Sequence, residues 1–474
     1  MRPALWKAVL IAAILTFTVL ESATTSAFDF RAFYCAGAAV QQHANPYRTE
    51  PLHSCERDRT DGYFAAFSRA VALPAPLPGY DIAIFAPLSE LPFVAAKAIW
   101  NIVITIAIGI ALVALVRMTG ISFLAVFSAL WLSFLLPSLQ FGELIPIAVA
   151  AICVAALCAQ RGRWAAAGVA AAVALVEPHL GLPVCIALAC WAPKARMTLL
   201  ACAGALALIS IRTLGIAQNV EYFSTVLPLH ALSEIGSDAQ LSLSVVLHYL
   251  GISDTTALRI GAAWYAAVVV LAVYASRALA RRCSDGAFLI AVPAALAVVG
   301  GSFIHVTDMV AALPLAMLGY ARIPQYRVAF IGAIILLALP WWHLALLLHQ
   351  RQYAIVPMTA AVGLYLAWDL SRRNVRFALG WSAAVLIALV GTNAWYVASS
   401  DAYHRTAPPV HITIDRAYPE ASWAWTNSKF ISTGSPASWV LRAPSWAGLL
   451  IVLFGTLGLV LRRRVGSQPL GEVT

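Results

Sequence analysis

The chain is short of charged residues. Only 11% of its 474 residues are Asp, Glu, Lys or Arg, whereas 61% are hydrophobic. So little polar surface cannot cover a water-soluble globule of this length, and a soluble domain is therefore excluded. We expect an integral membrane protein. The formal net charge is +10, but the excess arginines lie in short loops that would face anionic lipid headgroups, so we expect no nucleic-acid partner.

Charge is also nearly absent from the centres of the long apolar runs, and no repeat or low-complexity segment is evident. Transporters usually keep polar residues near the bilayer midplane, and many consist of two related halves. The sequence shows neither feature, which argues against a transport-type protein such as a lipid-linked sugar flippase. A non-catalytic envelope assembly factor stays open as an alternative.

Apolar windows long enough to cross a bilayer recur along the whole chain. They lie near residues 4–22, 88–116, 119–136, 143–159, 197–214, 259–276, 286–301, 308–321, 328–347, 353–370, 377–397 and 445–461. Between Arg163 and Lys194, two half-length apolar stretches flank Glu177-Pro178-His179. We expect short or broken helices there, because Pro removes a backbone donor. The pattern predicts an all-α polytopic fold with about 12–14 transmembrane or partial-span helices.

Basic clusters between the apolar windows predict the orientation of the chain. They are Arg161/Arg163, Lys194/Arg196, Arg277/Arg281/Arg282, Arg322/Arg327, Arg372/Arg373/Arg376 and Arg462/Arg463/Arg464. If each cluster is cytoplasmic, the spans alternate without contradiction. Both termini are then cytoplasmic in the cell (plasma) membrane, and the long loops 23–87, 215–258 and 398–444 face outward. We expect the first apolar segment to be an uncleaved signal anchor.

The first outer loop carries the sharpest motif. It reads Asp29-Phe30-Arg31-Ala32-Phe33-Tyr34-Cys35-Ala36-Gly37, followed by Asn45-Pro46-Tyr47. The aromatic and small residues of 30–42 recur at helical spacing, which predicts an amphipathic helix lying along the membrane surface. Such a helix would hold Asp29 at the water–lipid boundary. Asp is also a favoured N-cap, so a purely structural role for Asp29 is the alternative.

Of the eight cysteines, only Cys35 and Cys55 share the predicted outer face. They are therefore the candidate pair for a disulfide bond. By loop-closure entropy, such a bond would stabilise the first loop by roughly 3 kcal/mol.

Several short motifs, taken in order, resemble glycosyltransferase family 87 of the GT-C membrane superfamily. They are the acidic first loop with Asn-Pro-Tyr, Gln140-Phe141-Gly142-Glu143, Arg161-Gly162-Arg163-Trp164 with Ala167-Gly168 and Glu177-Pro178, Ser242-Leu243-Ser244, and Ser302-Phe303-Ile304-His305 with Asp308. Glu177 stands where the family has Lys, and the Gly-Gln order near residue 140 is altered. The resemblance covers about residues 5–320. It implies a GT-C-like catalytic core over 1–320 and additional C-terminal transmembrane helices over 321–474.

The resemblance also implies an activity. Family members transfer a hexose, typically mannose, from a polyprenyl-phosphate donor to a lipid or glycan acceptor on the outer face, with inversion. A carboxylate of the first outer loop deprotonates the acceptor, and Asp29 matches that position. No cofactor beyond the lipid-linked donor is implied, and we expect no metal site because spacing identifies no third ligand beside His305 and Asp308. The oligomeric state is not predicted.

His305 is the second predicted catalytic residue, because an imidazole at the mouth of a span can donate to a leaving phosphate. Asp308, three residues on, would share its helix face, or simply begin the next helix. Further candidates for binding the donor phosphate or the acceptor are Arg212, Arg259, Arg351, Glu143 and Tyr34. The arginines suit phosphate through their planar fork, although arginines at span ends also snorkel.

Two further features receive a structural interpretation. Glu177 departs from the family's basic residue and is treated as structural. Loop 398–444 contains Trp423, Trp425 and Trp439, which could stack on sugars, but the interfacial aromatic belt is the favoured interpretation.

Overall fold

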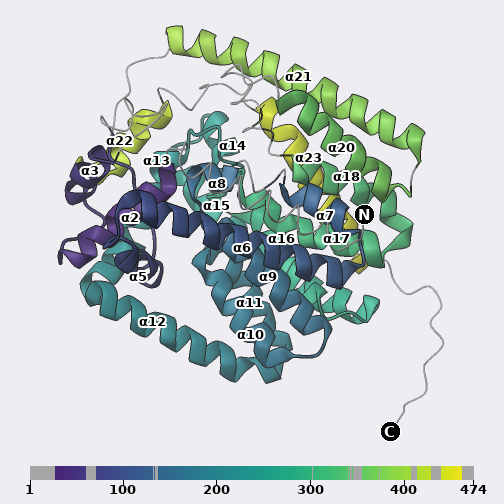
Figure 1. Ribbon diagram of the computed structural model, residues 1–474, viewed down its shortest axis with the longest axis horizontal. Coiled ribbons are helices and arrows are strands. Elements are labelled where there is room, and N and C mark those ends of the chain that lie inside the picture. The colour runs from purple at the N-terminus through teal and green to yellow at the C-terminus, as the bar shows by residue number, and fades with distance from the viewer. Residues whose placement is uncertain are drawn as a thin grey trace.

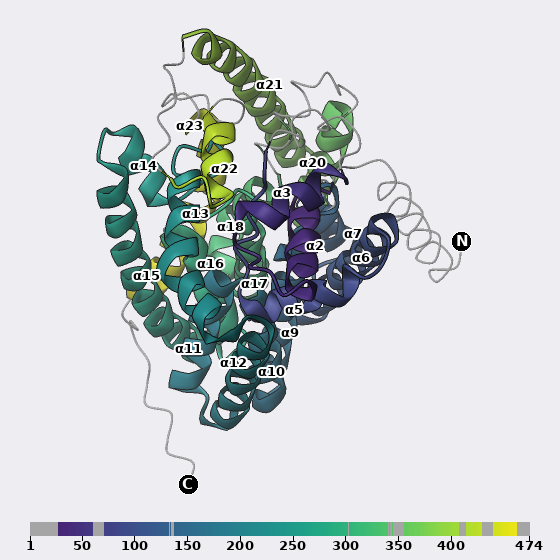
Figure 2. The same ribbon diagram turned by 90° about the vertical axis from the view of Figure 1, so that its left-hand side faces the viewer.

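The computed structural model describes residues 27–59, 71–131, 133, 137–301, 303–339, 341, 344, 355–372, 374–406, 414–428 and 439–461 (Figures 1 and 2). Within these ranges the chain forms helices and no named strand; one isolated antiparallel bridge joins Gln240 to His305. The predicted all-α fold is confirmed. The predicted signal anchor, Ser302 and Arg351 lie outside the described residues.

The helices follow the apolar windows of the sequence. They are α2 (Phe28–Gln41), α3 (Thr49–Arg57), α5 (Gly79–Leu88), α6 (Phe93–Thr119), α7 (Phe123–Leu130), α8 (Pro137–Phe141), α9 (Ile145–Gln160), α10 (Trp164–Val173), η2 (Ala174–Val176), α11 (Pro178–Trp191), α12 (Pro193–Glu221), η3 (Tyr222–Val226), α13 (Leu227–Glu234), α14 (Leu243–Tyr249), α15 (Asp254–Cys283), α16 (Phe288–Gly300), η4 (Asp308–Ala312), α17 (Leu313–Arg322), η5 (Pro324–Tyr326), α18 (Arg327–Ala338), α20 (Ile355–Leu370), α21 (Val375–Thr406), α22 (Glu420–Thr426) and α23 (Trp439–Leu461).

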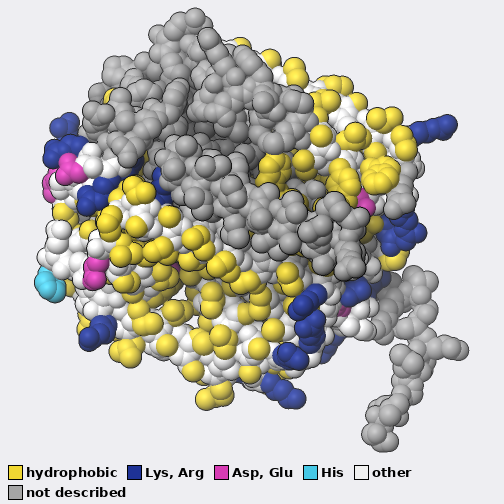
Figure 3. Space-filling model, viewed as in Figure 1, with side chains coloured by type: hydrophobic (Ala, Val, Ile, Leu, Met, Phe, Trp, Pro, Cys, Tyr) yellow, Lys and Arg dark blue, Asp and Glu magenta, His cyan; other side chains and the backbone are white. Residues whose placement is uncertain are grey.

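Within the described residues, four helical stretches are long and apolar enough to cross a bilayer: Phe93–Thr119, Pro193–Glu234, Asp254–Cys283 and Arg442–Leu461. A fifth candidate is the pair Asp308–Arg322 and Pro324–Ala338, which is bent by 113°. Shorter apolar helices, including α9, α11 and α16, pack among them. Hydrophobic side chains cover much of the face in Figure 3, and lipid contact accounts for such exposure. The chain is a polytopic membrane protein.

The predicted break between Arg163 and Lys194 is present. α10 and η2 end at Val176, and α11 begins at Pro178, so Glu177 lies at the junction of two half-length helices. The halves pack closely, because a Cβ on Gly181 would lie 2.5 Å from the backbone of Ala174. The break therefore brings Glu177 and His179 to the start of α11.

The predicted surface position of the first loop helix is wrong. α2 is buried on nearly every side: Phe30, Arg31, Ala32 and Ala36 are each at most 1% exposed. Its small residues let it pack against α5, and its aromatic residues contact rings of α5 and α6. The hydrophobic face that suggested membrane contact instead contacts protein, because the chain supplies complementary helices.

Close packing of α2 on α5 depends on Gly37. A Cβ at this position would lie 2.5 Å from the carbonyl carbon and oxygen of Phe85. On the other side of α2, a disulfide bond joins Cys35 to Cys55 of α3. α2 is thus fixed between α5 and α3, as the purple elements of Figure 2 show.

Replacing Gly37 with Ala should destabilise the protein by about 2 kcal/mol, because the added methyl group forces two backbones apart. Gly109→Ala in α6 is the matched control, since a Cβ there meets no atom within 4 Å. Thermal unfolding in detergent should show a lower midpoint for Gly37→Ala alone. Equal midpoints would contradict the packing described.

Candidate functional site

Asp29 lies in the first turn of α2, where its carboxylate is not used as a cap. The N-cap is Ala27, in left-handed conformation with φ 42°, and no side chain caps the helix. The purely capping interpretation of Asp29 is therefore wrong. The residue is only partly buried although its neighbour Phe30 is fully buried. Its carboxylate remains available for another role.

Glu143 is brought beside α2 by a tight turn. Gly142 has φ 82°, and a Cβ there would lie 2.5 Å from Cβ of Phe30. The Trp100 indole donates a 2.8 Å hydrogen bond to the Gly142 carbonyl, which fixes the turn. Ser138 Oγ donates to Glu143 Oε2 at 3.3 Å. Glu143 thus faces the start of α2, and the charges of Asp29 and Glu143 interact.

His305 is held by an antiparallel pairing of two loops. Leu241 N–H donates to the Ile304 carbonyl and Val306 N–H donates to the Ala239 carbonyl, each at 2.8 Å. The His305 N–H donates to Asp308 Oδ2, also at 2.8 Å. Asp308 therefore begins η4, as one of the two sequence interpretations had it, and also fixes the backbone of His305, which lies outside that helix.

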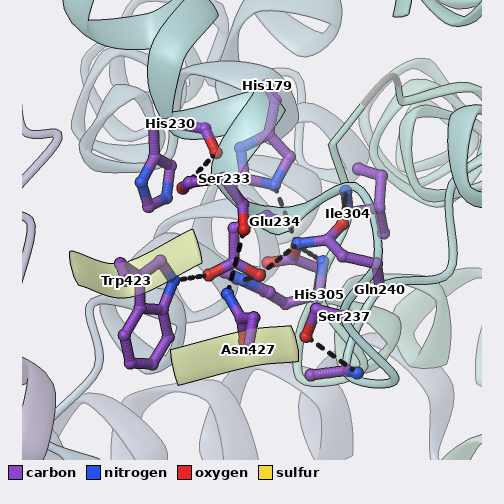
Figure 4. A network of polar contacts seen from close by, with 12 residues as sticks. His179, His230, Ser233, Glu234, Ser237, Gln240, Ile304, His305, Trp423 and Asn427 are labelled. Atoms are coloured by element: carbon purple, nitrogen blue, oxygen red, sulfur yellow. Dashed lines mark hydrogen bonds and ion pairs between the residues drawn. The ribbon is translucent and has the colours of Figure 1, made fainter. Parts of the chain in front are cut away.

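Glu234, the last residue of α13, is the partner of the His305 imidazole (Figure 4). Its Oε2 lies 3.5 Å from His305 Nε2 and accepts from Gln240 Nε2 at 3.3 Å. Its Oε1 accepts from the Trp423 indole. The Glu234 side chain is 4% exposed and that of His305 is 36% exposed. A substrate can therefore reach the imidazole but not the carboxylate behind it.

His179 adds a second imidazole to the cluster. Its Nε2 lies 3.3 Å from Asp308 Oδ2, and its Nδ1 lies 3.7 Å from Glu177 Oε2. Glu177, Asp29 and His305 interact through their charges. The helix break in 164–192 therefore places Glu177 and His179 at the site that contains Asp29.

The charges of the site are set by burial and by one another. Burial raises the pKa of Asp29, and Glu234 adds to this, while His305 and Arg31 oppose it; the result is a pKa of about 7. Burial alone would lower the pKa of His305, but Glu234, Asp308 and Glu143 outweigh it and raise the pKa to about 10. Burial and the nearby Asp29 raise the pKa of Glu143 well above its usual value.

The environment therefore favours a different protonation state for each of three groups. Asp29, with a pKa of about 7, can accept a proton, the raised pKa of Glu143 favours its protonated, hydrogen-bond-donating form, and His305, with a pKa of about 10, is a cation at neutral pH. Among the residues that the structure describes, no group of three or more His, Cys, Asp or Glu side chains could hold a metal ion.

The remaining sequence-predicted residues lie apart from this cluster. Tyr34 is buried and its hydroxyl donates to the carbonyls of Ser89 and Leu91, at 3.1 and 2.8 Å. Arg212 on α12 and Arg259 on α15 are exposed. In the part of the chain that the structure describes, none of the three forms a hydrogen bond or ion pair with Asp29 or His305, and their binding roles stay predictions.

Sequence reasoning missed Glu234 and underrated Glu177, His179 and Trp423. Glu234 falls in the predicted outer loop 215–258, in a stretch without a recognisable motif, so no local signal separates it from a surface acid. Glu177 and His179 had a signal, because polar residues beside a Pro break inside apolar sequence mark a protein-lined site. Trp423 contacts Glu234, and its ring centroid lies 5.6 Å from that of Phe28.

Residues 80–304 match the sequence model of glycosyltransferase family 87. This match covers 225 of the 474 residues and supports the resemblance to glycosyltransferase family 87. No curated protein and no solved structure matches the chain. The family 87 match contains Glu143, Glu177, His179 and Glu234, but it begins after Asp29 and ends one residue before His305. The family match therefore supports a glycosyltransferase, and the roles of Asp29 and His305 rest on the geometry.

Changing Glu234 to Gln should lower the pKa of His305 by at least about one unit, because a neutral amide no longer favours the imidazolium. NMR titration of ¹³C-labelled histidines in the full-length protein measures it, with the signal assigned through His305→Gln. Asp254→Asn is the control: it removes an acid that lies 2.7 Å from a different histidine, His248, and should leave the His305 titration unchanged. An unmoved His305 signal in Glu234→Gln would refute the pairing.

Proposed function

We propose that this glycosyltransferase moves a hexose, with mannose as the first candidate, from polyprenyl phosphate to a hydroxyl of a lipid or glycan on the extracytoplasmic face. Anomeric configuration inverts. The observation that carries the proposal is the electrostatic interaction between Asp29, with a pKa of about 7, and the partly exposed His305 cation.

In the proposed reaction Asp29 is the general base. The ionised carboxylate takes the proton of the acceptor hydroxyl as its oxygen bonds to the anomeric carbon, and the bond from that carbon to the phosphate oxygen breaks. A base whose pKa lies near the working pH combines a useful ionised fraction with useful basicity. Burial gives Asp29 this property, since an exposed Asp would be a much weaker base.

His305 supplies positive charge for the departing polyprenyl phosphate. Its imidazolium is maintained by Glu234 and is partly exposed, so it can meet the phosphate oxygens. The buried position of Glu234 keeps that acid from repelling the phosphate at close range. The sequence-predicted Arg212 and Arg259 are exposed on the outside of their helices, and we assign the first phosphate contact to His305.

Glu143 and the aromatic residues would bind the sugar and acceptor. The raised pKa of Glu143 favours its protonated form, so it would donate a hydrogen bond to a hydroxyl and leave the role of base to Asp29. Trp423 and Phe28 flank the site, and aromatic faces of this kind suit the apolar faces of sugars.

The position of the site supports an extracytoplasmic reaction. Glu143 precedes α9 and Asp308 begins η4, which leads into α17. The far ends of α9 and α17 meet at Asp285, which accepts from Gln160 at 2.8 Å and pairs with Arg322 at 3.0 Å. Basic clusters gather at that far end, and the positive-inside rule then assigns it to the cytoplasm and the site to the opposite face.

Changing Asp29 to Asn should reduce kcat by 10²–10⁴-fold with little change in donor binding, because general-base assistance is typically worth about that much. Membranes given radiolabelled polyprenyl-phosphate mannose, followed by separation of labelled glycolipids, measure it. The matched control is Asp58→Asn at the exposed end of α3, which should leave transfer unchanged. If Asp29→Asn kept near-normal turnover, the base would be another residue; wild-type membranes without transfer from any lipid-linked hexose would favour the non-catalytic alternative.

The pH dependence of kcat/KM should be bell-shaped. Activity rises as Asp29 loses its proton near pH 7 and falls as His305 loses its proton near pH 10. In His305→Gln the alkaline limb should disappear, and the acidic limb should move to higher pH, because the cation that lowers the pKa of Asp29 is gone. An acidic limb near pH 4 in the wild type would contradict a buried base.

A further inference from the structure

We propose that Arg442, in the first turn of α23, is a positioning residue that fixes the Ser237–Gln240 loop and, through it, the Glu234–His305 pair. The inference rests on the proposed function, in which His305 faces the leaving phosphate. Arg442 lies far beyond the family match, which ends at residue 304. Through Arg442, the C-terminal region takes part in completing the catalytic site.

Arg442 is buried and contacts one loop at three points. Its Nε donates to the Gln240 carbonyl at 2.6 Å, and Nη2 donates to the Ser237 carbonyl at 2.8 Å. Nη2 also lies 3.7 Å from Oδ1 of Asp238, which is fully buried. The guanidinium is 1% exposed. These three contacts are directed at the loop that follows Glu234, and the guanidinium also lies over the Tyr249 ring of α14, 5.5 Å from its centroid.

Gln240 links Arg442 to the catalytic groups. Its Oε1 accepts from the Ile304 N–H at 2.9 Å, and its Nε2 donates to Glu234 Oε2 at 3.3 Å. Its backbone pairs with that of His305. One residue thus contacts the Glu234 carboxylate, the strand-like segment before His305 and, through its carbonyl, Arg442. Figure 4 shows Gln240 lying between Glu234 and Ile304.

A second contact from α23 acts on the same segment. The Trp446 indole donates to the Leu241 carbonyl at 3.2 Å, one turn after Arg442. α23 therefore presents two donors to consecutive carbonyls of the loop. A helix that only packed against the core would have no need to place an arginine there, because a buried Arg–Asp pair adds little net stability compared with apolar side chains.

The chemistry of the contact requires arginine. A planar guanidinium donates along two directions at once, which matches two carbonyls on one loop, whereas the ammonium of lysine is a single compact charge. Lysine would keep the charge balance with Asp238 but would lose one of the two carbonyl contacts. The two substitutions Arg442→Lys and Arg442→Met therefore separate charge from geometry.

The test compares three variants of the full-length protein. We expect Arg442→Met to lower kcat by about 100-fold and to leave KM within about twofold of the wild type, because misplacing a catalytic group by about 1 Å costs about 100-fold in rate. We expect Arg442→Lys to lower kcat about tenfold. Arg322→Met is the control: it removes an arginine that pairs with Asp285 and donates to the Met118 carbonyl at 3.1 Å, at the far end of α17, and should keep normal kcat. Equal losses in Arg442→Met and Arg322→Met would overturn the proposal.

A double-mutant cycle tests whether Arg442 acts through Glu234. In a Glu234→Gln background, Arg442→Met should add less than about threefold to the loss, because the pair it positions is already broken. Arg322→Met should leave kcat unchanged in both the wild-type and the Glu234→Gln backgrounds. Full additivity of Arg442→Met and Glu234→Gln would mean a role in general stability and would refute positioning.

A readout without catalysis separates this inference from the proposed function. The groups whose charges act on His305 are Glu234, Asp308, Glu143, Asp29, Glu177, His179 and His230. Arg442→Met changes none of them, yet it should lower the NMR-measured pKa of His305 by about one unit by loosening Glu234. An unchanged His305 titration in Arg442→Met overturns the inference even if transfer is measured, and a shifted titration supports it even if transfer from polyprenyl phosphate is absent.

Discussion

The burial of α2 is the constraint on which the rest of the site depends. Packing of this helix against α5 and α6 holds Asp29 in a medium where a lone carboxylate is costly. Burial raises the pKa of Asp29, and the nearby His305 and Arg31 keep the rise from going further. A helix lying on the membrane surface would leave Asp29 in water with an ordinary pKa, and it would then be a poor base. The small residues of α2 are therefore part of the chemistry as well as of the packing.

The site is assembled from segments that are far apart in the sequence. Asp29 comes from the first loop, Glu143 from a turn before α9, and His179 from a break in the membrane helices. Glu234 and His305 come from two loops that pair with each other, and Trp423 and Arg442 come from the C-terminal region. Glu234 and Asp308 lie beside donors from other segments: Glu234 is next to the His305 imidazole and the Trp423 indole, and Asp308 is next to the His179 imidazole. Such a network is rigid when every member is satisfied.

Polar residues within apolar sequence proved more informative than exposed arginines. Glu177 and His179 occur beside a Pro that breaks a membrane helix, and both lie at the site. Arg212 and Arg259 occur near span ends, and both are exposed. The reason is energetic. A charge at a span end can reach the interface freely, whereas a polar group at a helix break is retained only where protein surrounds it.

Composition and periodicity determined the membrane class, the all-α fold, the positions of most helices and the break near Glu177, because hydrocarbon imposes length and apolarity on every crossing segment. The order of short motifs also indicated the glycosyltransferase family and drew attention to Asp29 and His305. Tertiary structure alone decided that α2 is buried, that Glu234 is the partner of His305, and that α23 fixes the loop between them. These depend on which helices pack together, and local sequence carries no record of contacts between residues such as Gln240 and Arg442, some two hundred positions apart.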